Sequence, residues 1–295
     1  MDITAKMVKE LREKTSAGMM DCKNALTSTG GDLEKAKDWL RERGLATVGK
    51  RAGRVAREGV VATAVAADLS RAAVVELSTE TDFVAKTEGF RELARNIVRY
   101  LAETPDAPAD VSGLLERECP LCKTKFGELL TQNTAKTGEK SEIRRFRVLK
   151  ADSGGFTHAY NHAGDKLSVL VALSAEKPGD DAVAASHELA MQIAAHNPSA
   201  VEIAALDPAE LEREKAIYGE LVKNSGKPEK VWPKIIEGYL SKYYQQVVLL
   251  EQPYIKEPKI SVKTYLAGLK AQTGAIKIQG FVRYQLAEEL GEGGA

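Results

Sequence analysis

The chain has 295 residues, of which 43% are hydrophobic and 28% charged, and its formal net charge is zero. This composition predicts two or three globular units with a sizeable core. Zero net charge argues against nucleic acid as the main partner, because such binding depends on neutralising phosphates. Nothing in the sequence approaches the ~20 apolar residues that a membrane span requires, so no membrane contact is expected. Three cysteines make no disulfide framework, and we expect a cytoplasmic protein.

The chain begins with a pattern that predicts three short helices. Apolar residues recur at helical spacing up to Leu11, and Ser16-Ala-Gly18 ends this first helix, because glycine readily takes positive φ. A second helix is expected at 20–27. Asp32 caps a third helix, for which Gly44 is the expected stop.

The segment 50–57 is rich in lysine and arginine but lacks aromatic residues that would stack on bases, so we interpret it as a solvated linker. Short valine-rich runs and amphipathic stretches follow it. We expect strands at 60–65 and 72–77, followed by helices at 88–101 and about 113–134. A second set has strands at 147–150, 156–160 and 167–173 and a helix at 182–196. Two long helices are expected at 207–222 and 229–246, joined by breaker residues at 224–228, and then a helix at 262–272 and a strand at 276–284.

A strand pair followed by a helix occurs twice, which favours an α+β fold over a doubly wound sheet. We predict an N-terminal three-helix domain that resembles a ubiquitin-associated domain, followed by a core of two α+β subdomains with an inserted antiparallel helical hairpin. The expected boundaries are 1–50 for the helical domain, 51–57 for the basic linker, 58–140 for core subdomain N and 141–290 for core subdomain C, with the hairpin at 207–246.

The most informative segment is 76–86, which reads Glu-Leu-Ser-Thr-Glu-Thr-Asp-Phe-Val-Ala-Lys. It lies where a predicted strand gives way to a helix, and side chains at such a corner can project from a rigid scaffold. From the corner alone, the alternative is that Asp82 caps a turn and Phe83 is a core ring.

No convergent set of catalytic residues is apparent, so we expect no enzyme activity, no cofactor and no metal. Gly226-Lys227 is followed by proline and lacks the upstream glycine of a phosphate-binding loop, which argues against direct nucleotide binding. Cys119-Pro-Leu-Cys122 has the spacing of half a zinc site but has no second pair, and we place it at a helix start. His158 and His162 flank a predicted strand end and would lie ~13 Å apart, too far for one metal.

Thr81-Asp-Phe-Val-Ala85 closely resembles the most characteristic pentapeptide of the elongation factor Ts family, the nucleotide-exchange factors for elongation factor Tu. The segment 11–26 is similar to the amino-terminal signature of that family, with Ser16 where glycine is usual. Further matches lie at 187–198, 225–230 and 250–254. The resemblance extends from residue 1 to about 285.

The resemblance implies a protein that binds elongation factor Tu, in its GDP-bound and nucleotide-free forms, and promotes GDP release. It implies that the magnesium and phosphate site of the partner is disturbed by Thr81, Asp82, Phe83 and Val84. It assigns partner contacts to Arg12, Met19, Met20 and His162. We expect the two methionines in the first interhelical loop, where an exposed, adaptable apolar pair can dock a partner; on physical grounds alone, core filling is equally compatible.

Other functions remain to be weighed. Residues 1–44 could form a ubiquitin-like-binding adaptor, which would leave 81–85 without a role. Cys119 and Cys122 could serve a thiol oxidoreductase. The helical hairpin could also mediate a homodimer.

Overall fold

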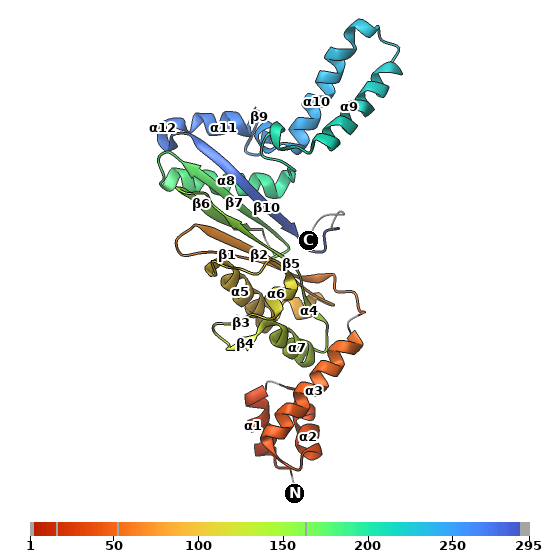
Figure 1. The fold of residues 1–295 in the computed structure, drawn as a ribbon, viewed down its shortest axis with the longest axis vertical. Coiled ribbons are helices and arrows are strands. Elements are labelled where there is room, and N and C mark those ends of the chain that lie inside the picture. The colour runs from red at the N-terminus through yellow and green to blue at the C-terminus, as the bar shows by residue number, and fades with distance from the viewer. Residues whose placement is uncertain (1–2, 16, 52, 163, 290–295) are drawn as a thin grey trace.

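The computed structural model describes residues 3–15, 17–51, 53–162 and 164–289. These residues form an elongated molecule with three helices at one end, two β-sheets in the middle and a helical hairpin at the other end (Figure 1). The predicted α+β class is confirmed. Ser16, residue 52 of the expected linker and residue 290 of the expected core lie outside the described residues. Within the described ranges, no helix is long and apolar enough to cross a membrane.

The first three helices surround a small core of their own. They are α1 (Ala5–Thr15), α2 (Met19–Ser28) and α3 (Leu33–Arg51). Asp32 caps α3 as predicted, because its Oδ1 accepts the backbone N–H groups of Glu34 and Lys35 at 3.0 and 3.1 Å. The buried core residues are Val8, Leu11, Cys22, Ala25, Leu26 and Ala36.

Two details of this region differ from the prediction. Gly44 does not end α3, which continues to Arg51 and so includes the start of the expected linker. A single glycine costs a helix only about 1 kcal/mol, and good helix formers such as Leu45 and Ala46 follow it. Gly18 has φ −60°, so the break between α1 and α2 does not use a left-handed glycine.

The first sheet has the order β1-β2-β5 and is antiparallel throughout. Its strands are β1 (Glu58–Val65), β2 (Arg71–Thr79) and β5 (Ser141–Lys150). The short α4 (Asp82–Ala85) and the amphipathic α5 (Glu88–Glu103) follow β2. The apolar stripe of α5, including Phe90 and Ile97, packs with Val75 and Leu77 of the sheet.

The segment after α5 is not the single helix that we expected at about 113–134. It consists of α6 (Val111–Leu115), a small hairpin of β3 (Glu118–Cys119) and β4 (Thr124–Lys125), and α7 (Phe126–Thr137). Pro120 lacks a backbone N–H and Lys123 is left-handed with φ +53°, so this stretch turns instead of continuing a helix. The two cysteines therefore lie in a β-hairpin and not at a helix start.

The second sheet has the order β10-β7-β6. Its strands are β6 (Gly155–Asn161), β7 (Leu167–Ala175) and β10 (Ile276–Gln285), and α8 (Asp180–His196) packs against it. The strand that we expected at 147–150 in this second set instead belongs to β5, which pairs with β2. Local hydrophobic pattern identifies a strand, but its partner depends on tertiary packing.

The two sheets are joined by a layer of apolar side chains and by hydrogen bonds between their edges. Val61, Ala72 and Val74 of the first sheet pack against Leu170 of the second. The Val61 N–H donates to the carbonyl oxygen of Asp165 at 2.7 Å, which fixes the β6–β7 turn against β1.

The helical hairpin extends away from the second sheet (Figure 1). It consists of α9 (Pro208–Lys223) and α10 (Trp232–Val247), with short 3-10 turns at Ile203–Ala205, Glu229–Val231 and Leu249–Glu251. Tyr218 and Tyr239 stack between the helices with ring centroids 5.3 Å apart. The return to the sheet passes through β8 (Pro253–Tyr254), β9 (Glu257–Ser261), α11 (Val262–Gly268) and α12 (Lys270–Thr273).

A buried carboxylate connects β2, β5 and the segment after β10. Glu76 is fully buried; its two oxygens accept Arg144 Nη1 at 2.9 Å and Arg145 Nε at 2.7 Å. The backbone N–H of Ala287 also donates to Glu76 Oε1 at 2.8 Å. Arg145 lies over the ring of Tyr284, 4.0 Å from its centroid. The network therefore joins strands of both sheets.

We expect Glu76→Ala to lower the free energy of unfolding by about 3–5 kcal/mol, because removing one partner of a buried ion pair leaves the other charges uncompensated. Urea denaturation measures this loss. The control is Glu13→Ala, since Glu13 forms only an exposed pair with Lys9 at 3.9 Å and should change stability by less than about 0.5 kcal/mol. Equal, small effects in both variants would contradict a structural role for the Glu76 network.

Candidate functional site

The corner between β2 and α5 directs one aromatic side chain into solvent. Thr81 caps α4, and its Oγ1 accepts the Val84 N–H at 3.5 Å. Val84 is only 9% exposed and packs with Ala85 into the core under the first sheet. Phe83 is 81% exposed. The alternative in which Phe83 is a core ring and Asp82 is the cap is therefore wrong.

Glu139, which lies between α7 and β5, forms hydrogen bonds that hold the backbone of this corner. Its carboxylate accepts three donors: Thr79 Oγ1 at 3.2 Å, the Thr81 N–H at 2.9 Å and Thr81 Oγ1 at 2.7 Å. Glu139 follows Gly138, which ends α7 in the left-handed conformation with φ +73°. The sequence contains a signal for that helix end but none for the pairing with Thr81, and our sequence analysis missed Glu139.

A second carboxylate connects the corner to the segment that follows α3. Glu80 Oε1 accepts the Lys140 N–H at 2.8 Å, and Glu80 Oε2 accepts Arg54 Nη1 at 2.8 Å. The Lys140 Nζ in turn donates to the carbonyl oxygen of Arg54 at 3.4 Å. The corner is thus bonded both to the end of α7 and to the chain that leads from the helical domain.

Asp82 supplies a negative charge beside the exposed ring. Its Oδ2 lies 2.6 Å from Lys86 Nζ, one turn further along. The hydrogen bond from Lys86 lowers the pKa of Asp82, and the positive charge of Lys166 lowers it further. The carboxylate is therefore ionised at neutral pH, with cations close to it.

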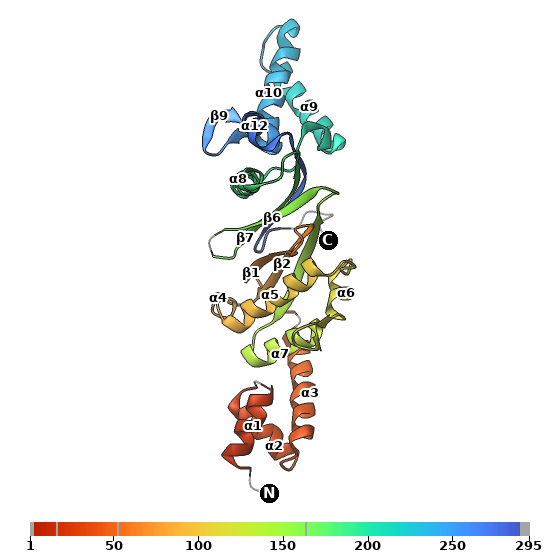
Figure 2. The same ribbon diagram turned by 90° about the vertical axis from the view of Figure 1, so that its left-hand side faces the viewer.

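His162 lies on the turn between β6 and β7, the turn that leads to Lys166. Its Nδ1 is 2.8 Å from the hydroxyl of Tyr160, and the side chain is exposed. On the same turn, Asp165 pairs with Arg91 of α5 at 3.8 Å. In Figure 2, α4 and the β6–β7 turn project from the same edge of the molecule. The fold thus brings the β6–β7 turn of the second sheet and α4, which follows the first sheet, to one edge of the molecule.

Two other histidines form a pair between β6 and α8. His158 Nε2 lies 3.2 Å from Nδ1 of His187 on α8, and His187 also meets the ring of Tyr160 edge-on at 5.4 Å. Burial, and then the neighbouring His187, lower the pKa of His158, which favours a neutral ring at neutral pH. Among the described residues, no three potential metal ligands come together.

The other predicted contact residues lie in the helical domain. Met19 and Met20 form the first turn of α2, so their expected place in a loop was wrong; they are 60% and 65% exposed. Arg12 is exposed on α1. Figure 1 places α1 and α2 at the end of the molecule, away from α4. A 2.6 Å ion pair between Arg41 of α3 and Glu128 of α7 docks this domain on the core.

Comparison with known proteins gives a consistent result. The family model described as Elongation factor TS matches residues 80–288. The chain is 42% identical over 290 residues to Elongation factor Ts of Clostridium botulinum (strain ATCC 19397 / Type A), covering 98% of this chain and 94% of the relative. Elongation factor Ts of Clostridium tetani (strain Massachusetts / E88) is 41% identical over 289 residues, with the same two coverages.

We expect Glu139→Ala to loosen the corner, because the variant loses the acceptor of three hydrogen bonds and such bonds to a charged group contribute about 1.5–3 kcal/mol. The amide of Thr81 should exchange with deuterium about tenfold faster or more, measured by nuclear magnetic resonance. Glu142→Ala is the matched control, since Glu142 forms an ion pair with Lys140 at 2.6 Å on the next strand. Unchanged protection of Thr81 in Glu139→Ala would show that the carboxylate does not hold the corner.

Proposed function

The chain belongs to the elongation factor Ts family, and we propose that it is a guanine-nucleotide exchange factor that binds elongation factor Tu with GDP and promotes GDP release. The observation that carries the proposal is the 81% exposed ring of Phe83 on a corner bonded from two sides. A large apolar side chain in this position has no role in the core of its own molecule. It is available to enter a partner.

In this proposal, the segment Thr81 to Val84 acts as one unit with divided roles. Thr81 and Val84 position the turn, one by capping it and the other by packing into the core. Phe83 is the apolar wedge, and Asp82 is an ionised carboxylate that rearranges polar groups around the magnesium of the partner. Loss of a divalent cation that neutralises phosphate charge removes a large electrostatic contribution to nucleotide affinity.

Contacts away from the corner would supply the binding energy. The β6–β7 turn, which carries His162, projects from the same edge as α4, and Met19, Met20 and Arg12 offer a separate surface on the helical domain. Because the helical domain is bonded to the core through Arg41 and Glu128, both surfaces can be presented together. Methionine suits such a surface, because its flexible side chain adapts to irregular apolar partners.

Linkage determines how the complex responds to nucleotide. By whatever factor this protein weakens GDP binding, GDP weakens the binding of this protein, at ~1.4 kcal/mol for each tenfold change. The complex is therefore transient in the presence of nucleotide. A ubiquitin-like-binding adaptor built on residues 1–44 gives the Phe83 corner no task, and a pull-down against each partner separates the two functions.

We expect Phe83→Ala to reduce stimulated GDP release by about tenfold or more, because burying a phenylalanine side chain in a partner is worth about 1.5–3 kcal/mol. Stability should change by less than about 0.5 kcal/mol, since the ring is exposed. Stopped-flow release of a fluorescent GDP, affinity for nucleotide-free partner and thermal melting are measured on the same samples. Both Phe83→Ala and Asp82→Ala should slow GDP release more than they weaken formation of the nucleotide-free complex.

Two controls make this result decisive. Leu121→Ala removes a 65% exposed apolar side chain away from the corner and should leave release unchanged. Phe90→Ala removes a fully buried ring and should cost about 3–5 kcal/mol of stability. Normal GDP release by both Phe83→Ala and Asp82→Ala would disprove the proposed mechanism.

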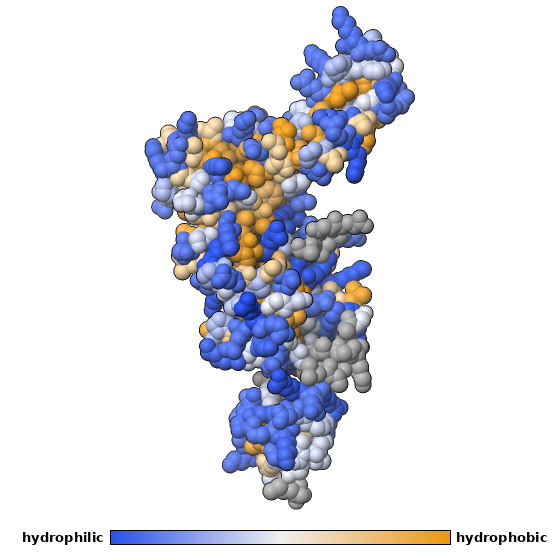
Figure 3. Space-filling view, viewed as in Figure 1, coloured by the Kyte–Doolittle hydropathy of each residue, from blue (hydrophilic) through white to orange (hydrophobic). Residues whose placement is uncertain are grey.

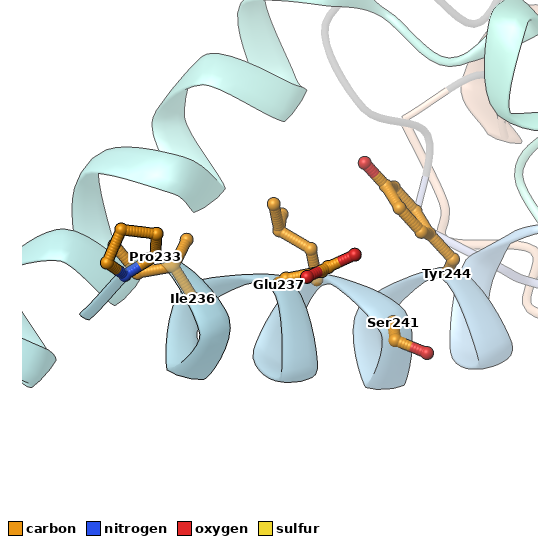
Figure 4. A pocket seen from close by; sticks show the side chains of 6 residues that line it. Pro233, Ile236, Glu237, Ser241 and Tyr244 are labelled. Carbon is orange, nitrogen blue, oxygen red and sulfur yellow. The ribbon is translucent and has the colours of Figure 1, made fainter. Parts of the chain in front are cut away.

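We also propose that the helical hairpin mediates a homodimer. Hydrophobic side chains lie among hydrophilic ones along the hairpin (Figure 3). Pro233, Ile236, Leu240 and Tyr244 recur about once per helical turn and line a shallow pocket of about 570 Å³ on α10 (Figure 4). A second copy of this helix pair offers the same surface, as a twofold interface requires.

Sedimentation velocity tests this homodimer. We expect a concentration-dependent dimer for the unaltered chain and a monomer for Ile236→Glu, because a charge placed in the apolar pocket cannot be paired across the interface. Lys234→Glu changes a neighbouring exposed residue and should leave the dimer intact. A monomer at every concentration of the unaltered chain would exclude this interface.

A further inference from the structure

The β3–β4 hairpin carries one buried and one exposed cysteine. Cys119 is 1% exposed and belongs to the core under the first sheet, whereas Cys122 is at the surface. The backbone N–H of Cys122 donates to Cys119 Sγ at 3.4 Å, and the N–H of Lys123 donates to the carbonyl oxygen of Cys119 at 2.9 Å. The turn therefore holds the backbone of Cys122 within hydrogen-bond distance of the Cys119 sulfur.

The fold, and not a flexible chain, maintains this arrangement. Lys123 has φ +53°, a conformation that a residue with a side chain adopts only where its surroundings impose it. The hairpin pairs Cys119 with Thr124, and Phe126 at the start of α7 is fully buried. Both ends of the turn are thus fixed.

We propose that Cys119 and Cys122 form a reversible intrachain disulfide by exchange with a small-molecule disulfide such as oxidised glutathione. The Cys122 thiolate attacks one sulfur of the oxidant, and one glutathione thiolate leaves. The Cys119 thiolate then attacks Cys122 Sγ and releases the second glutathione. One S–S bond forms and one breaks, two electrons pass to the oxidant, and the two protons of the pair end on the released thiols.

Proximity makes the second step fast. Because Cys119 is already beside the mixed disulfide, its attack is intramolecular and proceeds at a high effective concentration. The glutathione adduct of Cys122 should therefore not accumulate.

The first step should be slow at neutral pH. Burial, and then the hydrogen bond with Cys119, raise the pKa of Cys122 to about 11, so only a small fraction is thiolate near pH 7. Below that pKa, each unit of pH increases the thiolate fraction, and hence the rate of closure, about tenfold.

The set of available ligands favours a disulfide over a metal site. A structural zinc ion takes four ligands, and the described parts of the chain bring no third candidate to these sulfurs. The remaining cysteine, Cys22, is fully buried in the helical domain, where its Sγ lies 3.9 Å from Thr15 Oγ1. It should remain a thiol and so provides an internal control.

The test equilibrates the full chain in buffers with graded ratios of reduced to oxidised glutathione, followed by acid quenching, alkylation and mass spectrometry of the peptides. We expect Cys119 and Cys122 to lose alkylation together in one two-electron transition, while Cys22 stays alkylated. Cys122→Ser should abolish the transition and Cys22→Ser should leave it unchanged. The rate of closure should rise about tenfold from pH 7 to pH 8.

Three results would overturn the proposal. One is three free thiols at the most oxidising ratio. Another is a stable glutathione adduct on Cys122 with Cys119 still reduced. The third is stoichiometric zinc in the purified reduced chain that prevents closure, since the pair would then be a ligand set.

Discussion

The carboxylate of Glu76 has no contact with water, and its hydrogen bonds connect the first sheet to the segment that follows the second. A buried charge is stable only where donors surround it, and here two arginines of β5 and a backbone N–H after β10 supply them. The apolar layer at Val74 and Leu170 holds the sheets together, but it selects no single orientation, because apolar contact has no direction. The directional bonds of Glu76, together with the hydrogen bond from Val61 to Asp165, favour one arrangement of the sheets.

That arrangement decides which surface residues can act together. Glu76 lies on β2 three residues before Thr79, where the strand runs into the Phe83 corner. The β6–β7 turn with His162 belongs to the other sheet and is bonded to β1 through Val61 and Asp165. A shift of one sheet against the other would move the β6–β7 turn relative to α4. The proposed binding surface thus depends on residues that touch no partner.

The sequence predicted the elements with strong periodicity and missed those that depend on distant contacts. The stripe of α5 predicted its start at Glu88 correctly, and valine-rich β2 was placed within two residues of its ends. The two-residue strands β3 and β4 are too short for any periodicity. Glu139 is 58 residues from Thr81, and a hydrogen bond over that separation leaves no local pattern. The position of Phe83 could be predicted, but its exposure depends on how Val84 packs beneath it.

The size of the available interaction explains why an exchange factor of this kind would need several contact surfaces. One buried phenylalanine ring supplies about 1.5–3 kcal/mol, and by reciprocity this can lower the affinity for a nucleotide by only about 10- to 150-fold. Even this effect requires a rigid corner, because the more deformable of the two proteins takes up most of the deformation at their interface. The bonds from Glu139 and Glu80 stiffen the corner, so in the proposed mechanism the distortion would fall on the partner. In the proposed mechanism, any larger effect on nucleotide affinity would have to come from the charge of Asp82 and from the separate contacts of the helical domain.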